Sequence, residues 1–388
     1  MNTLKKKINK LFFAISLILF TFFGCVSKHD SKGIDTRPID NEEIKYSKGF
    51  TIDYFDNYTK VTVLNPWTKY DEAYHVYYLY KGDKPNNLPY SSSKESVIKI
   101  PLTSVSVNTF AYFEFLNLID ELGTVKGVTD GFRIYNPTIL KNLASGDIVD
   151  LGDPFNPNIE KTIALKPQAS INSAYAQVDS YSDRIAKLGI PIIYSIEWME
   201  NNPLARAEWI KLIAAFYDKQ QQAREAFDQI EQKYLQTKAL TENISQKIAV
   251  LSGDIFQDTW YVPGGQSFNA ELFRDAGLNY YLNEDKSSGS IGLDIESVLT
   301  TFNNADLWIG CDAKSYKELG TKDSKYMLIN AVKKHNVYNN LKRTTTSGGN
   351  DYFEGAIANP HLVLSDIIKV AYPELLPDYS LTYIKPLD

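Results

Sequence analysis

The sequence predicts an α/β protein in which two similar lobes are joined by one long, rigid helix. Three observations predict this fold class. Short apolar strands alternate with amphipathic helices on both sides of residues 218–240, which is the pattern of α/β proteins. Residues 218–240 contain no Gly or Pro and have the spacing of a single helix. A similar unit of helix then strand occurs once in each half, as PNIEKTIALKPQASI and LDIESVLTTFNNADLWI.

The N-terminal residues have the three parts of a secretory signal. Several lysines are followed by a short apolar run from Leu11 to Phe23, which ends at Gly24 and Cys25. A small residue directly before Cys resembles the bacterial lipobox, although Phe23 stands where a small residue is usual. Residues 1–25 are therefore predicted to be a lipoprotein signal peptide ending at a lipidated Cys25. The alternative is an uncleaved anchor. Either way, the folded part would lie in the periplasm or cell envelope, tethered to a membrane.

Residues 26–59 are expected to form a tether, because this stretch begins with a polar and charged composition. The N-terminal lobe is predicted over residues 60–217. It starts with the strand-like segments KVTVLN and YHVYYLYKG. It ends with the amphipathic helix PLARAEWIKLIAAFY, which Pro203 begins.

The connecting helix at residues 218–240 is predicted from its cap and its periodicity. Asp218 occupies the N-cap position, and Gln221 three residues later completes a capping-box pattern. Apolar residues at spacings of three and four form one stripe, made of Ala223, Ala226, Phe227, Ile230 and Tyr234. Such a helix would be roughly 33 Å long, and we expect it to join the two lobes as a strut.

The C-terminal lobe is predicted over residues 241–388. It begins with the strand QKIAVLSGD, continues with the helix FNAELFRDAGL, and ends with the helix NPHLVLSDIIKVAYP. Cys311 lies in the apolar run ADLWIGC, so it is expected to be a buried, inert thiol.

Composition and motifs exclude several function classes. The net charge is −6, without a Lys/Arg-dense stretch outside the N-terminus, which argues against nucleic acid as the partner. None of the 4 His residues is spaced for metal binding with another His or Cys, so no metal site is predicted. The chain has no G-x-S-x-G elbow, P-loop or dinucleotide fingerprint, so neither catalytic residues nor a cofactor are predicted. The 26 Tyr and 5 Trp suit a binding surface.

Several segments together resemble the substrate-binding proteins of ABC importers for metal chelates, namely ferric siderophores, haem and cobalamin. In that family a single long helix bridges two lobes. The matching segments cover most of residues 100–380 and are GVTDGFRIYNP, NPLARAEWIKLIAAFYDK, TWYVPGGQSFNAELFRDAGLNYY, GLDIESVL, ADLWI and GGNDYFEGAIANPHLVLSDIIKVAYPELLPD. The resemblance implies capture of an iron complex and its delivery to a permease dimer with its ATPase. A cobalamin or corrinoid ligand stays open, as do a glycan-binding lipoprotein and a hydrolase.

The resemblance also implies a docking carboxylate on each lobe for permease arginines. The matching positions are Glu160 in PNIEKTI and Glu296 in LDIESVL, each in the first turn of an expected helix. For the ligand, we expect aromatic and polar side chains on loops that follow strands. The first-lobe candidates are Phe132, Arg133, Tyr135, Phe155, Tyr175 and Trp198. The second-lobe candidates are Trp260, Tyr261, Asp351, Tyr352 and Glu354. Among them, Arg133 is suited to grip a carboxylate or a catecholate-type oxygen.

Overall fold

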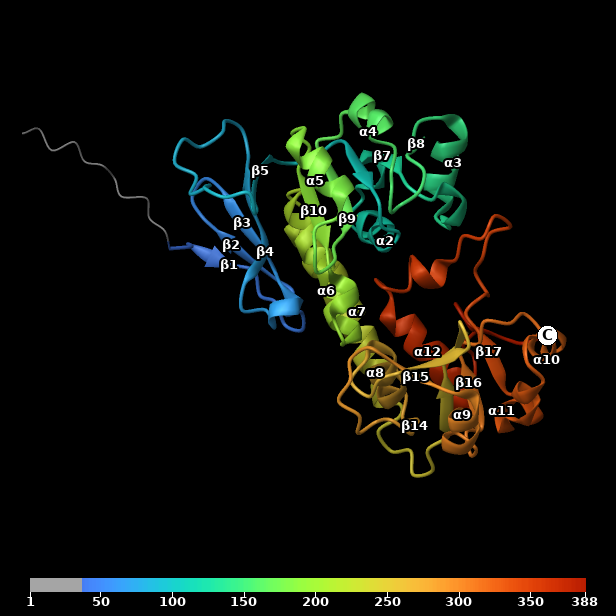
Figure 1. The fold of residues 1–388 in the computed structure, drawn as a ribbon. Coiled ribbons are helices and arrows are strands. Elements are labelled where there is room, and N and C mark those ends of the chain that lie inside the picture. Colours follow the sequence, from blue (N-terminus) through green and yellow to red (C-terminus); the bar gives the residue numbers. More distant parts are fainter. Residues whose placement is uncertain (1–36) are drawn as a thin grey trace, which may run out of the picture. The chain divides into compact units, whose positions relative to one another are not determined.

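The computed structural model describes residues 37–388, and residues 38–388 form one compact unit. The expected signal peptide and Cys25 lie outside the described residues. Within them, two α/β lobes are joined by a long helix, so the predicted fold class is confirmed (Figure 1). No helix in residues 37–388 has the length and apolar character that crossing a membrane requires.

An N-terminal sheet precedes the first lobe. Its strand order is β1-β2-β3-β4-β5, and only the pair β4 and β5 is parallel. The strands are β1 (Asp40–Asn41), β2 (Phe50–Tyr54), β3 (Thr59–Leu64), β4 (Ala73–Tyr80) and β5 (Glu95–Lys99). The tether predicted over residues 26–59 is therefore wrong from Asp40 onward. Its apolar residues alternate along short strands, and Phe50 and Ile52 are buried, which a reading based on polar composition misses.

Two buried carboxylates attach the segment between β1 and β2 to the first lobe: Glu208 of helix α6 (Pro203–Ala215) and Glu200, which precedes that helix. Glu208 accepts the main-chain N–H groups of residues 45–47 at 2.8–2.9 Å. Glu200 accepts that of Gly49 at 2.9 Å. The Lys211 ammonium donates to Glu208 at 2.8 Å and neutralises it. This segment is therefore an integral part of the fold.

The first lobe is built on a parallel sheet with the order β10-β9-β6-β7-β8. Its strands are β6 (Val105–Val107), β7 (Val125–Val128), β8 (Val149–Asp150), β9 (Ala169–Ser173) and β10 (Ile192–Ser195). Its helices are α2 (Ala111–Leu118), α3 (Pro137–Ser145), α4 (Ile159–Leu165) and α5 (Ser180–Lys187). Because the strands are parallel, their carboxyl ends meet at one edge of the sheet.

The second lobe repeats this plan. Its main sheet has the order β14-β11-β16-β17-β18, parallel except for β18. The strands are β11 (Ala249–Ser252), β14 (Asn279–Tyr280), β16 (Leu307–Ile309), β17 (Val337–Asn339) and β18 (Lys385–Pro386). A small antiparallel sheet contains β12 (Asp254–Phe256), β13 (Thr259–Pro263) and β15 (Ser290–Leu293). The helices are α8 (Phe268–Asp275), α9 (Ile295–Thr301), α10 (Tyr316–Lys322), α11 (Asn330–Lys333) and α12 (Pro360–Ala371). Cys311 is buried and free, as expected.

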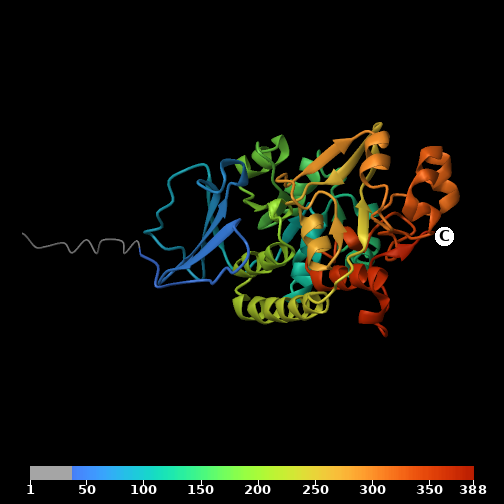
Figure 2. The ribbon, with the colours of Figure 1, turned by 90° about the horizontal axis from the view of Figure 1, so that it is seen from below.

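The bridge between the lobes is α7 (Gln220–Ala239), which packs on α6 (Pro203–Ala215) and on α12 (Figure 2). Its predicted stripe is buried except for the half-buried Ala226. Tyr234 donates from the stripe to Asp275 of α8 at 2.6 Å, which ties the bridge to the second lobe.

The predicted capping box of the bridge is wrong. The N-cap is Lys219, without a side-chain capping bond. Asp218 has a φ of 57°, in the left-handed region. Its carboxylate pairs with Lys81 at 3.0 Å, and Gln221 donates to Glu225. The chain reverses sharply between α6 and α7, so Asp218 serves the turn instead of the helix end.

Candidate functional site

A cavity opens in each lobe at the carboxyl ends of the parallel strands. In open α/β sheets this edge is where ligands bind. The first-lobe cavity, of about 230 Å³, is lined by residues that follow β6, β7 and β9. The second-lobe cavity, of about 450 Å³, is lined by residues at the ends of β11, β16 and β17. Corresponding edges of two similar lobes therefore carry the two cavities.

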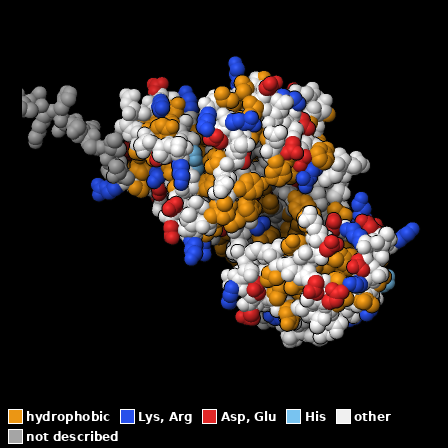
Figure 3. Space-filling view, viewed as in Figure 1, with side chains coloured by type: hydrophobic (Ala, Val, Ile, Leu, Met, Phe, Trp, Pro, Cys, Tyr) orange, Lys and Arg blue, Asp and Glu red, His pale blue; other side chains and the backbone are white. Residues whose placement is uncertain are grey.

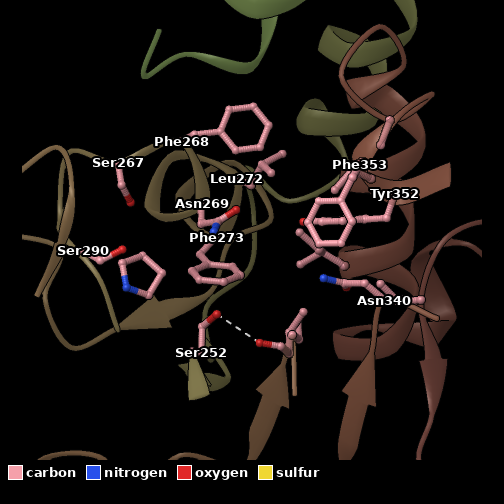
Figure 4. A pocket seen from close by; sticks show the side chains of 18 of the residues that line it. Ser252, Ser267, Phe268, Asn269, Leu272, Phe273, Ser290, Asn340, Tyr352 and Phe353 are labelled. Carbon is pink, nitrogen blue, oxygen red and sulfur yellow. Dashed lines mark hydrogen bonds between the residues drawn. The ribbon is translucent and has the colours of Figure 1, made fainter. Parts of the chain in front are cut away.

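The second-lobe cavity has a polar floor and aromatic walls (Figure 4). Ser252 at the end of β11 donates to the Ile309 carbonyl at 3.0 Å. Asn340 follows β17, and its buried Oδ1 has no hydrogen-bond partner among the described residues. The walls come from α8 and from the short helix Asp351–Phe353, through Phe268, Phe273, Tyr352 and Phe353.

The first-lobe cavity rests on a buried polar network. Asn108 donates through Nδ2 to Asn172 Oδ1 at 2.9 Å, and Asn172 donates to Ser182 at 2.8 Å. Because Asn172 Oδ1 can only accept, this network fixes the orientation of the Asn108 amide. Asn108 Oδ1 is left buried without a partner among the described residues. It is a candidate acceptor for a ligand donor, since buried polar atoms are otherwise satisfied.

An apolar groove connects the two lobes. It is lined by Phe110, Tyr175 and Trp198 of the first lobe and by Phe353 and Ile357 of the second. Figure 3 shows hydrophobic side chains gathered in the hollow between the lobes. The arrangement can hold a ligand with large apolar faces, while the ends of the strands supply a small number of polar contacts.

Three predicted residues lie at a contact between the lobes instead of lining a cavity. Glu354 is buried and accepts the Tyr135 N–H at 2.8 Å. Arg343 pairs with Asp351 at 2.9 Å and donates to the Tyr135 hydroxyl at 3.3 Å. Burial raises the pKa of Glu354 to about 7. Tyr135, Asp351 and Glu354 are therefore brought together as an interlobe latch.

The structure places the other predicted residues as follows. Arg133, Phe155 and Tyr175 line the first cavity. Tyr261 and Tyr352 line the second. Trp198 lines the groove with Tyr175, at 6.0 Å between ring centroids. Phe132 is 61% exposed and lines none of these spaces. Ligand contact by the lining residues stays a prediction.

Trp260 is the clearest case in which the structure contradicts the expectation of a ligand contact. It is 0% exposed, and its ring centroid lies 5.1 Å from that of Trp308 in the core. Its indole N–H donates to the Ser252 carbonyl at 3.2 Å. Successive side chains of a strand point to opposite faces. In β13 the side chain of Trp260 points into the core, and that of Tyr261 points to the cavity. The sequence pair Trp-Tyr does not reveal which of the two faces inward.

Arg206 is the main site residue that the sequence reasoning missed. Its Nε donates to the Glu200 carbonyl and its Nη2 to the Trp198 carbonyl, both at 2.8 Å. Its guanidinium lies 3.9 Å from the centroid of the Phe268 ring, within reach of a cation–π contact. Burial lowers the pKa of Arg206 to about 10. The only sequence signal was a charged residue in the first turn of a largely apolar helix.

Trp67, in the connection between two strands of the N-terminal sheet, was also missed. It belongs to the short helix Pro66–Thr68 between β3 and β4, and its ring centroid lies 6.2 Å from that of Trp198. Nearby, Tyr74 donates to the Tyr175 carbonyl at 2.9 Å. The N-terminal sheet thus supports two aromatic residues of the groove. A further space of about 660 Å³ lies between β4, β5 and α5.

The two predicted docking glutamates occupy equivalent positions. Glu160 is the second residue of α4 and Glu296 the second of α9, and both are exposed. Each helix is capped by the preceding side chain, Asn158 or Asp294, which accepts an N–H three residues on. Glu296 pairs with Lys325 at 2.6 Å, which lowers its pKa. Their docking role stays a prediction.

The described residues contain no group of three or more His, Cys, Asp or Glu side chains placed to hold a metal ion.

Comparison with known families matches residues 111–343 to the family described as periplasmic binding protein. An uncharacterized lipoprotein of Methanocaldococcus jannaschii is 28% identical over 381 residues, which is 90% of this chain and 89% of the relative. A second uncharacterized lipoprotein of that organism is 22% identical over 302 residues, 73% of each chain. The family match begins after the N-terminal sheet ends at Lys99.

Solved structures of distant sequence share the fold. A possible iron-binding periplasmic protein from Staphylococcus epidermidis ATCC 12228 is 18% identical, with 70% of this chain and 100% of that chain covered and a TM-score of 0.55. A periplasmic haem-binding protein from Pseudomonas aeruginosa is 12% identical, with 74% and 95% covered and a TM-score of 0.54. A periplasmic vitamin B12-binding protein of Vibrio cholerae is 14% identical, with 70% and 98% covered and a TM-score of 0.50.

Proposed function

This chain belongs to the periplasmic binding protein family, and from that premise we propose that it captures an iron complex, a siderophore or haem, between its two lobes. In this proposal it is the substrate-binding component of an ABC importer and delivers the complex to a membrane permease and its ATPase. It binds its substrate and is not an enzyme.

The observation that supports this proposal is the pairing of two cavities across one apolar groove. The cavities, of about 450 and 230 Å³, lie at the carboxyl edges of the two lobes. The groove between them is lined by Phe110, Tyr175, Trp198 and Phe353. A small polar solute needs a compact, hydrogen-bonding pocket. A chelate with large apolar faces is better matched by aromatic walls with few polar groups.

The names of similar structures support the ligand class. They describe proteins that bind iron, haem or vitamin B12. We therefore place an iron complex first and a corrinoid second. Both relatives from Methanocaldococcus jannaschii are named lipoproteins, which supports attachment of this chain to a membrane through Cys25.

A binding titration tests the proposal. Because residues 38–388 form one compact unit, the protein starting after Cys25 retains the whole site. It is titrated with ferric protoporphyrin, several ferric siderophores and cobalamin while tryptophan fluorescence is followed. Trp198 in the groove predicts saturable quenching at one ligand per protein by an iron complex. Quenching by cobalamin alone would assign a corrinoid. If none of the chelates quenched the fluorescence, the proposal would be contradicted, and a glycan ligand or hydrolysis would be favoured.

A further inference from the structure

The second-lobe cavity contains a single charge. Of the residues that line it, Arg206 is the only one with a side chain charged at neutral pH, and the others are aromatic, aliphatic, Ser, Asn, Gly or Pro. Arg206 comes from α6, beside the bridge, and its guanidinium stacks on Phe268 of α8 in the second lobe. The cavity therefore presents a positive group to whatever enters it.

No carboxylate of the described residues lies within ion-pair distance of Arg206. Its Nε and Nη2 donate to main-chain carbonyls, and its Nη1 has no hydrogen-bond partner among the described residues. Glu197 is the strongest acidic neighbour, but it is buried and engaged by the Ser195 hydroxyl. Burial raises the pKa of Glu197.

Such an arrangement is unfavourable without a ligand. Arg206 is half-buried, and a partly buried charge with no ion partner loses hydration that two neutral carbonyls restore only in part. Groups of this kind concentrate at functional sites, where the missing partner is supplied by the ligand. A guanidinium with one free edge is suited to a carboxylate oxygen, because charge-assisted hydrogen bonds are the strong ones.

We propose that Arg206 binds a carboxylate of the ligand, so that this protein selects acidic chelates over neutral ones. The inference rests on the proposed function and narrows it. In the bound state the carboxylate enters the second-lobe cavity and neutralises Arg206, while the apolar body of the chelate lies along the groove. Neutral corrinoids and neutral siderophores leave Arg206 unpaired and are disfavoured.

Matched ligands give the test. Ferric protoporphyrin, which has two carboxylates, is compared with its dimethyl ester, and a ferric carboxylate siderophore with a neutral ferric hydroxamate. The wild type is expected to bind the acid of each pair about 10- to 100-fold more tightly, the range of one hydrogen-bonded charge. The affinity for the acids should also fall as salt is added, because the contact is between charges. Equal affinity for acid and neutral partner in both pairs would overturn the inference without any variant.

Variants then locate the effect. Arg206→Gln is expected to lose about 10- to 100-fold in affinity for the acids and to leave the neutral ligands unchanged. Arg206→Lys should retain part of the preference, since it keeps the charge but not the fork. The control is Arg274→Gln. Arg274 also donates to a main-chain carbonyl, that of Gly265 at 2.8 Å, but it pairs with Glu271 and does not line the cavity.

The outcomes separate the two proposals. Binding of an acidic chelate with unchanged affinity in a folded Arg206→Gln protein would overturn the role of Arg206 and leave the proposed function standing. If the wild type bound only neutral chelates, the role of Arg206 would also be overturned and the proposed function would stand. Failure of the wild type to bind any iron complex would overturn the proposed function, and this inference with it.

Discussion

At the residue scale, the interlobe latch is a contact sensitive to pH near neutrality. Glu354 is 3% exposed and accepts the N–H of Tyr135 from the opposite lobe. Burial outweighs that hydrogen bond and raises the pKa from its ordinary 4.5 to about 7. Desolvation therefore decides the charge of this carboxyl group near neutrality.

The sign of the pH effect follows from linkage. Between about pH 4.5 and 7 the folded protein holds the Glu354 proton more tightly than the unfolded chain. The free energy of unfolding then falls as pH rises through this window. Glu354→Gln removes the titration but keeps an acceptor for Tyr135. As the pH rises from 5 to 8, we expect the free energy of unfolding of the variant to increase by about 1–3 kcal/mol relative to that of the wild type. Denaturant unfolding at both pH values measures this, and a difference independent of pH would contradict it.

Individual site residues were predictable where the sequence placed them just after a strand or beside a turn. Tyr175, Trp198, Tyr261 and Tyr352 follow strands or lie beside Gly-rich turns, and they line the groove or a cavity. Trp260 was misassigned because strand facing depends on the register of β13. Arg206 could not be found, because the distance from α6 to the cavity is a property of the packed structure.

At the scale of elements, the N-terminal sheet depends on a few buried polar contacts. Glu208 alone accepts three main-chain N–H groups, and it is fully buried beside Lys211. Breaking a buried ion pair leaves the partner charge unsatisfied. The short segment before β2 therefore depends mainly on Glu208, with Glu200 holding its last residue, Gly49.

We predict that Glu208→Gln destabilises the protein by about 3 kcal/mol, because Lys211 is left buried without a counter-ion. The loosened segment should also expose Lys45 and Lys48 to trypsin sooner than in the wild type. Thermal unfolding and a digestion time course measure the two effects. Glu225→Gln, an exposed change on α7, serves as the control. Equal stability and digestion in both variants would show that Glu208 does not fasten the sheet.

The bridge helix shows which features of an element can be predicted from the sequence. The apolar stripe of α7 was predicted because periodicity is local, and Ala223, Phe227, Ile230 and Tyr234 are buried. The N-cap was not, because the tight turn from α6 places Asp218 in a left-handed conformation. The strands β1 and β2, inside the predicted tether, were missed for a related reason: each is short, and only their pairing reveals that they belong to the sheet.

At the scale of the whole molecule, the duplicated plan was the most predictable feature. The units PNIEKTI and LDIESVL became α4 and α9, with a capping side chain and an exposed glutamate at equivalent positions. A repeated pattern specifies two similar lobes because each lobe buries its own sheet. The space between the lobes was not predictable, since it depends on contacts far apart in sequence.

The equivalent glutamates predict how the molecule docks. Changing both Glu160 and Glu296 to Arg should abolish uptake in vesicles that contain the permease and ATPase, because rim charges orient a partner. Ligand affinity should stay unchanged, since neither residue lines a cavity. The control changes two other exposed glutamates, Glu225 and Glu242, to Arg. Normal uptake by the Glu160/Glu296 variant would refute docking through these residues.

The central claim is that the two carboxyl edges form one ligand site. Hydrogen exchange of the protein, measured with and without a saturating iron complex, tests it most directly. The account predicts slower exchange in both lobes at once, around residues 108–111, 173–175 and 197–199 of the first and 352–357 of the second. Protection confined to one lobe, or to the space between β4, β5 and α5, would contradict it.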